Sequence, residues 1–122
     1  MKQEDKDLLL RDLCARLPYG VKVHTNIPEM DYSTEELIER ESDKILSIED
    51  IDWLKNNCGE FKPYLRPMSS MTEEEEEEYH NLCISPINHH WNITDWLNAH
   101  HFDYRDLILK GLALPAPDGM YN

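Results

Sequence analysis

The residues of this sequence best suited to chemistry are its six histidines and three cysteines, which could together bind zinc. His80 and Cys83 are three residues apart and would share one face of a helix. Four further histidines form adjacent doublets at positions 89–90 and 100–101. Structural zinc sites usually combine two closely spaced ligand pairs, whereas adjacent helical residues point in different directions. We therefore expect no metal and no other cofactor, with His80 and Cys83 as the weak candidate ligands.

Signatures of catalysis are missing from the sequence. The cysteines and histidines match no nucleophile motif, and with only four glycines there is neither a dinucleotide-binding nor a phosphate-binding loop. Pairs of carboxylates carry little information, because Asp and Glu together number 25. The sequence predicts a protein that is not an enzyme. Two alternatives stay open, a small enzyme of unrecognised type and a structural domain stabilised by a metal on His80 and Cys83.

A run of six glutamates is the densest charge in the chain. Ser70 stands three residues before Glu73, and Thr72 three before Glu75, which is the spacing of a helix-capping box. Six acids exceed what a cap needs, because like charges four residues apart cost a few tenths of a kcal/mol per pair. The run is therefore either a solvated helix face or a surface that docks on a basic partner. The candidate partner-binding residues are Glu73, Glu74, Glu75, Glu76, Glu77 and Glu78.

The overall charge narrows the class of partner. Lys and Arg number 12 against 25 acids, so the net charge is −13. Such a surface repels a phosphate backbone, and we expect no direct contact with nucleic acid. A basic protein, including one whose groove otherwise holds nucleic acid, is the more natural partner.

The compartment follows from what the sequence lacks. No run of about 18 apolar residues predicts a membrane span. The charged beginning of the chain has no apolar signal-peptide core, so we expect a cytoplasmic protein that does not contact membranes. The three cysteines, Cys14, Cys58 and Cys83, are then expected to be free thiols.

The helices and strands of the first half are predicted from the spacing of apolar residues and from residues, such as proline, that end a helix. Residues 4–17 predict a helix with the apolar stripe Leu9, Leu10, Leu13, Cys14 and Leu17, leaving Asp12 off the stripe, and Pro18 ends it. Residues 21–25 alternate as a strand, and 26–34 have the composition of a loop. Residues 35–40 could form a helix or a strand, and 44–48 favour a strand.

The middle of the chain holds a short helix and an extended segment. Ser47 could cap a helix over 49–56, with a further strand of a small barrel as the competing interpretation. Pro63 and Pro67 favour an extended connector or edge strand over 61–68. The helix that contains the glutamates should end at Pro86, with Tyr79, Leu82 and Cys83 facing the core.

The last part of the chain predicts two helices packed as a hairpin. Asn92 or Thr94 would cap the first, which runs through His100 and buries Trp96. Asp103 would cap the second, which runs through Lys110 with Leu107 inward and Gly111 after its end. Residues 115–122 would form a loose tail.

These elements predict an α+β fold in a single domain spanning residues 1–122. A small antiparallel sheet or partial barrel, over about 20–66, would pack against helices from both ends of the chain. With 40% hydrophobic residues, the chain can build a modest core.

Three stretches carry a resemblance to known sequences: LLLRDLCARLPYGVKV at 8–23, KPYLRPMSSMTEEE at 62–75 and DWLNAHHFDYRDLILKGLAL at 95–114. In these the chain resembles a group of small uncharacterised proteins from phages and mobile elements of gut anaerobic bacteria. The resemblance covers most of the chain, but the sequence differs from that group over residues 26–60. It implies a viral or mobile-element protein acting in the bacterial cytoplasm, and it implies no activity and no site residues. The expected function is an accessory protein that binds a protein partner through its acidic surface.

Overall fold

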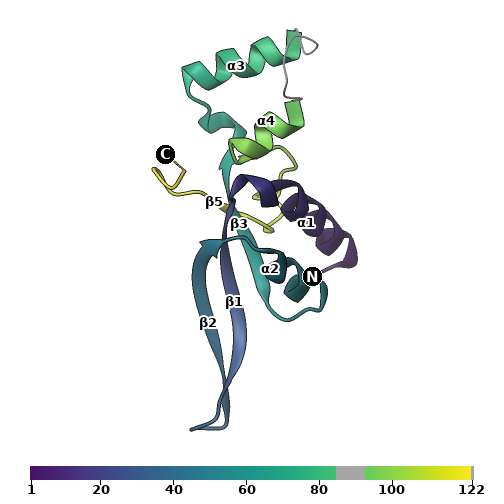
Figure 1. Cartoon of the computed structure of the whole chain (residues 1–122), viewed down its shortest axis with the longest axis vertical. Helices are drawn as coiled ribbons and strands as arrows, with labels where there is room; N and C mark the ends of the chain where they lie inside the picture. Colours follow the sequence, from purple (N-terminus) through teal and green to yellow (C-terminus); the bar gives the residue numbers. More distant parts are fainter. Residues whose placement is uncertain (85–92, 122) are drawn as a thin grey trace.

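The computed structural model describes residues 1–84 and 93–121, and these form the predicted α+β fold. The helices are α1 (Gln3–Arg16), α2 (Ile48–Lys55), α3 (Glu73–Ile84) and α4 (Ile93–Ala99), with short 3-10 turns at Leu17–Tyr19 and Met68–Ser70. The strands are β1 (Lys22–Asp31), β2 (Glu36–Ile45), β3 (Glu60–Pro67), β4 (Phe102–Asp103) and β5 (Leu114–Pro115). The elements lie along one long axis, with α3 at one end and the β1–β2 turn at the other (Figure 1).

The sheet is mixed and open. Its strand order is β2-β1-β3-β4, and β5 also pairs with β3. β1 is antiparallel to β2 and β3, whereas β4 and β5 are parallel to β3 over two residues each. The predicted edge strand over 61–68 is therefore an interior strand. The prediction of a small antiparallel sheet or partial barrel over about 20–66 is corrected in one respect, because β4 and β5 from the C-terminal part add parallel pairing and make the sheet mixed.

Strand pairing overrides local composition between residues 26 and 48. The predicted loop over 26–34 is wrong, because β1 continues to Asp31 and pairs with β2 along its whole length. Pro28 is tolerated because β1 has left β3 at that point and has a neighbour on one side only. Residues 36–40 belong to β2, and Glu35 lies in the turn before it. The strand ends at Ile45, before the predicted 48.

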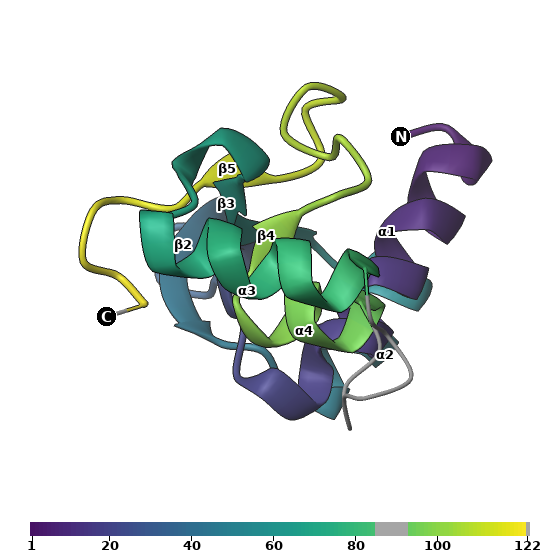
Figure 2. The same cartoon turned by 90° about the horizontal axis from the view of Figure 1, so that it is seen from above.

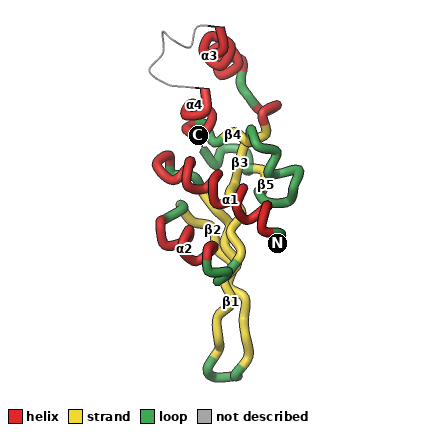
Figure 3. The backbone as a smooth tube through the Cα atoms, turned by 90° about the vertical axis from the view of Figure 1, so that its right-hand side faces the viewer, coloured by secondary structure: helices red, strands yellow, loops and turns green. Residues whose placement is uncertain are grey.

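The predicted short helix is confirmed as α2. The hydroxyl of Ser47 and the carboxylate of Asp50 form a capping box, in which the Ser47 amide donates to Asp50 Oδ2 over 2.9 Å. The helix lies beside α1 on one face of the sheet (Figure 3). A further barrel strand in this segment is therefore excluded.

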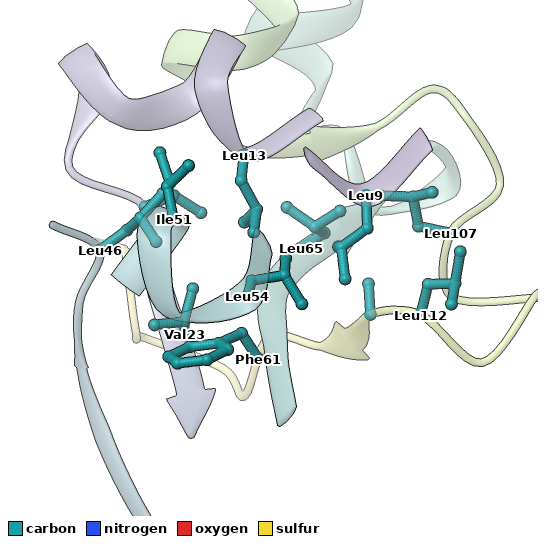
Figure 4. Packing of buried hydrophobic residues seen from close by; sticks show 12 residues of the cluster. Leu9, Leu13, Val23, Leu46, Ile51, Leu54, Phe61, Leu65, Leu107 and Leu112 are labelled. Carbon is teal, nitrogen blue, oxygen red and sulfur yellow. The ribbon is translucent and has the colours of Figure 1, made fainter. Parts of the chain in front are cut away.

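The main core lies between these two helices and the sheet. α1 contributes Leu9 and Leu13, which are fully buried, as the predicted stripe requires. The stripe is wrong at two positions, because Cys14 is exposed and Asp12 is fully buried. Figure 4 shows the packing of this cluster, whose other members are Val21, Val23, Leu46, Ile51, Leu54, Phe61, Leu65, Leu107, Leu112 and Ala113.

A second apolar cluster joins α3 to α4 at the end of the molecule (Figure 2). It contains Leu82, Trp96, Leu97 and Phe102, all buried. The predicted burial of Trp96 is confirmed. Tyr79 packs on this cluster as expected, but Cys83 is exposed, so its predicted inward orientation is wrong. Pro86, predicted to end the helix, lies outside the described residues.

The predicted second helix of the C-terminal hairpin is replaced by one capped turn. Asp103 does act as a cap, since its two carboxylate oxygens accept the amides of Leu107 and Ile108 over 2.9 and 3.0 Å. Asp106, however, has a φ of 58°, which interrupts a right-handed helix inside the predicted span. Gly111 then takes a φ of 75°, and the chain continues into β5. Leu107 is nevertheless fully buried, as predicted.

The chain after β5 is anchored, which corrects the predicted loose tail. The Ala116 amide donates to the Leu65 carbonyl over 2.8 Å. The Tyr121 hydroxyl donates to the carbonyl of Tyr64 over 2.7 Å and accepts the Lys22 amide over 2.9 Å. Residues 116–121 therefore belong to the folded body.

Candidate functional site

The glutamate run forms the first two turns of α3, and the structure divides its six residues into two groups. Tyr79 and Leu82 mark the side of α3 that packs on α4, and Glu75 and Glu78 each lie four residues before one of them. These two glutamates therefore share the inward side of the helix. Glu75 is half-buried, and Glu78 is exposed like the other four, which are Glu73, Glu74, Glu76 and Glu77.

Glu75 is a structural residue that holds the start of α3. Its carboxylate accepts both terminal nitrogens of Arg66 over 2.7 and 2.6 Å, and it also accepts the Thr72 amide over 3.0 Å. The Thr72 hydroxyl accepts the Glu75 amide in return, so the predicted Thr72–Glu75 capping box is confirmed. His100 Nδ1 lies 3.2 Å from the same carboxylate. The hydrogen bonds from Arg66 lower the pKa of Glu75 from 4.5 to about 2, against the opposing effect of burial.

The alternative cap, from Ser70 to Glu73, does not form. The Ser70 hydroxyl donates to the Pro67 carbonyl over 2.6 Å, within the 3-10 turn before α3. Glu73 is exposed on the surface. Glu78 is engaged in a different way, because Trp96 Nε1 donates to its carboxylate over 3.2 Å. Two of the six candidate partner-binding residues thus fix α3 to the body: Glu75, which is half-buried, and Glu78, which remains exposed.

Arg66 is the residue that connects α3 to the sheet. It lies in β3, and its guanidinium also stacks 4.2 Å above the Phe102 ring. A delocalised cation on an aromatic face contributes a cation–π attraction as well as its hydrogen bonds. The exposed acidic face of α3 is therefore presented on a fixed support, although α3 stands at the end of the molecule (Figure 1).

The weak metal candidates are both on α3 and both exposed. His80 and Cys83 gain no third ligand there, and within residues 1–84 and 93–121 no three His, Cys, Asp or Glu side chains gather around a common point. The histidine doublet at 89–90 lies outside the described residues. His100 and His101 have separate surroundings: the first stacks at 4.2 Å on Trp96 and the second at 3.8 Å on Tyr121.

The structure also forms a buried ion cluster that the sequence did not reveal. Asp12 accepts Arg16 Nε over 2.9 Å and Arg105 Nη1 over 2.6 Å, and the side chains of Asp12 and Arg16 are fully buried. Arg16 also donates to the Phe102 carbonyl over 2.6 Å. Only the spacing of Asp12 and Arg16 was visible in the sequence. This cluster ties α1 to the C-terminal segment, and of its three side chains only that of Arg105 is partly exposed, at 19%.

A second polar cluster, on the strands, was also missed. Asp43 Oδ1 lies 2.8 Å from both His24 Nδ1 and the Tyr64 hydroxyl. The hydrogen bond with His24 is the main cause of the lowered pKa of Asp43. Beside it is a hollow of about 270 Å³, lined by His24, Asn26, Glu41, Glu60, Lys62 and Leu114. These residues are far apart in the sequence, and it is the register of β1 with β2 that places His24 opposite Asp43.

In this strand cluster both ring nitrogens of His24 face carboxylates, since Nδ1 lies 2.8 Å from Asp43 Oδ1 and Nε2 lies 3.8 Å from Glu41 Oε1. Here the His24 ring and the Tyr64 hydroxyl both point to the same carboxylate of Asp43, which holds them in place. The cluster is best described as a polar tie between β1, β2 and β3.

No helix in the described part of the chain is both long and apolar enough to cross a bilayer.

The comparisons with known proteins add no relative to these observations. No family model matches the chain, and neither the curated proteins nor the solved structures contain a significant match.

Proposed function

We propose that this chain is a non-catalytic accessory protein, of phage or mobile-element origin, that binds a basic protein in the bacterial cytoplasm. The observation that supports the proposal is the division of the glutamate run. Glu75 and Glu78 secure the helix to Arg66 and Trp96, while the other four glutamates are exposed and take no part in that attachment. A rigid row of like charges meets a basic surface at lower entropic cost than a flexible tail does.

The charge of the whole molecule supports the same class of partner. A net charge of −13 accelerates the encounter with a positive surface and disfavours a phosphate backbone. A protein that normally holds nucleic acid in a basic groove would therefore be a suitable target. Binding there would block the groove and inhibit that protein.

The test replaces with glutamine the four exposed glutamates that do not attach α3 to the body, at positions 73, 74, 76 and 77. The matched control makes the same charge change at four exposed acids away from α3: Glu4→Gln, Asp7→Asn, Glu49→Gln and Asp52→Asn. Wild type and both variants are immobilised and exposed to bacterial lysate at low and high salt. Partners that are captured are then titrated against each form.

We expect wild type and control to bind the same basic protein, with an affinity that falls as salt rises, and DNA to compete for it. The α3 variant should bind it more weakly and with a flatter salt dependence, mainly through slower association. Equal affinity of the α3 variant at both salts would show that the glutamates only solubilise the helix.

A further inference from the structure

The β1–β2 hairpin extends well beyond the body of the protein as a two-stranded arm (Figures 1 and 3). β3 pairs with β1 only from Val23 to Asn26, whereas β2 pairs with β1 as far as Asp31 and Glu36. Residues 27–40 therefore have no third strand beside them. An isolated two-stranded ribbon is at best marginally stable in water, so an arm of this length needs an explanation outside the fold itself.

The tip of the arm is held in a defined turn. The Asp31 carboxylate accepts the Ser33 amide over 2.9 Å and the Ser33 hydroxyl over 2.7 Å. The Glu35 amide closes the turn by donating to the Asp31 carbonyl over 2.7 Å. Tyr32, inside this turn, is 89% exposed. The turn thus presents an aromatic side chain to solvent.

Two more apolar side chains are exposed beside the tip. Met30 and Leu37 are direct cross-strand partners and are 47% and 70% exposed. Opposite residues of an antiparallel pair lie on the same face, so these two form one small apolar surface. Side chains of this kind contribute nothing to the core, which fits a surface kept for recognition.

β2 is the outer strand of the sheet, so one of its edges is free. On one face of this strand the side chains are mostly acidic. Residues at every second position of a strand share a face, so Leu37 is followed on its own face by Glu39, Glu41 and Asp43. We call these four residues the acidic strip.

The cations of β2 do not neutralise the acidic strip. Arg40 pairs with Glu29, and Lys44 pairs with Asp50 over 3.1 Å. Both positive charges of the strand are therefore taken up by carboxylates of this chain. The free edge is left with a net negative face.

The acidic strip also argues against a second copy of this chain on the same edge. Two β2 strands related by a two-fold axis would pair antiparallel, with the same face of each strand on the same side of the joint sheet. The two acidic strips would then lie side by side, and like charges opposite each other are destabilising. Charged edge strands commonly prevent self-association in this way. Basic side chains, in contrast, would meet the strip favourably.

From this geometry we propose that the arm is a docking strand. Its β2 edge pairs antiparallel with an extended segment of a partner protein, whose alternate lysines or arginines lie beside Glu39, Glu41 and Asp43 and whose apolar residue lies beside Leu37. Backbone hydrogen bonds to an exposed edge supply affinity in such pairing, and side chains on alternate positions supply specificity. The inference is independent of the proposed role of α3, which lies at the opposite end of the molecule (Figure 1).

The test uses the full chain and the synthetic peptide TTKTKTKTV as the probe. In antiparallel pairing its lysines fall opposite Asp43, Glu41 and Glu39, and its valine falls opposite Leu37. Binding is followed by changes in the NMR shifts of backbone amides. Two further peptides, N-methylated at alternate residues in the two possible phases, remove the amide donors of one peptide edge each.

We expect the probe to shift the amides of residues 36–45 and of the tip, and one of the methylated peptides to lose binding. Reversing two charges of the strip, Glu39→Lys with Glu41→Lys, should weaken binding about tenfold. The matched pair Glu4→Lys with Glu49→Lys makes the same charge change at two exposed glutamates outside both the arm and α3, and it should leave the probe affinity unchanged. Amide shifts of each variant without peptide verify that the arm still folds.

Three results would overturn the proposal. Both methylated peptides could bind as tightly as the probe, which would show attraction by charge without strand pairing. The control pair Glu4→Lys with Glu49→Lys could weaken binding of the probe as much as the arm pair does, which would show a response to net charge rather than a contact at β2. Finally, wild-type protein could form a concentration-dependent dimer through β2, which would assign the edge to a second copy. None of these results bears on capture of a partner by α3.

Discussion

Glu75 shows how one residue of a uniform acidic run acquires a role of its own. It receives hydrogen bonds from Arg66 and Thr72, while its neighbour Glu76 is exposed. The difference comes from helical geometry, because Glu75 lies four residues before Tyr79 and seven before Leu82 on the packed side. A sequence of identical residues thus contains different environments.

Glu75→Gln should destabilise the protein by about 1.5–3 kcal/mol, because charge-assisted hydrogen bonds to Arg66 are lost. Chemical denaturation at neutral pH measures this. Glu76→Gln is the matched control and should change stability by no more than about 0.5 kcal/mol. Equal effects of the two substitutions would contradict the structural role of Glu75.

The pH dependence of this contribution has a defined sign. The folded pKa of Glu75, about 2, lies below the ordinary value of 4.5. Its contribution is therefore present above pH 4.5 and is lost as the pH falls from 4.5 through 2. The difference in stability between wild type and Glu75→Gln should shrink over that range.

At the scale of elements, the turn after β4 packs like a helix without being one. Asp103 caps it and Leu107 enters the main core, yet Asp106 and Gly111 both have positive φ. The buried leucine, rather than a long helix, fixes this segment to α1 and the sheet. The contribution of this turn to the stability of the fold therefore comes mainly from the packing of Leu107.

Leu107→Ala should cost about 2–5 kcal/mol, as is usual for a leucine removed from a closed core. Leu109→Ala is the matched control in the same turn, because Leu109 is 88% exposed. Thermal unfolding of the two variants measures the difference. An unchanged melting temperature for Leu107→Ala would show that this turn does not pack as the structure has it.

At the scale of the whole molecule, His101 and Tyr121 join distant parts of the chain. Their rings stack at 3.8 Å, and the Tyr121 hydroxyl bridges β1 and β3. Burial, together with the charge of Arg16, lowers the pKa of His101 from 6.5 to about 4. Burial raises the pKa of Tyr121 from 10.0 to about 12. Both shifts favour the neutral side chain.

These two shifts predict a limited pH range of full stability. The folded state disfavours protonated His101, so stability should fall as the pH decreases from 6.5 through 4. It also disfavours ionised Tyr121, so stability should fall again as the pH rises from 10 through 12. Urea midpoints measured across this range test both limits. His101→Phe keeps an aromatic ring beside Tyr121 and should reduce the loss between pH 6.5 and 4, whereas an unchanged acid profile would contradict the assignment.

Part of this architecture was readable from sequence because its signals are local. The capping pairs Ser47–Asp50 and Thr72–Glu75 mark the starts of α2 and α3, and apolar periodicity marks α1. The burial of Trp96 and Leu107 follows from the polar residues around them. In the candidate site, the spacing of Glu75 and Glu78 from Tyr79 and Leu82 places these two glutamates on the packed side of the helix, and this spacing can be read from the sequence.

The remainder was decided by partners far away in the chain. Residues 26–31 have the composition of a loop but form a strand because β2 supplies ten paired residues opposite β1. Asp12 is buried because Arg105, 93 positions later, completes its charge pairing. Tyr121 is fixed by backbone groups of Lys22 and Tyr64. Pairing between distant segments has no local periodicity, so the long arm, the parallel strands and the anchored C-terminal segment are properties of the tertiary structure alone.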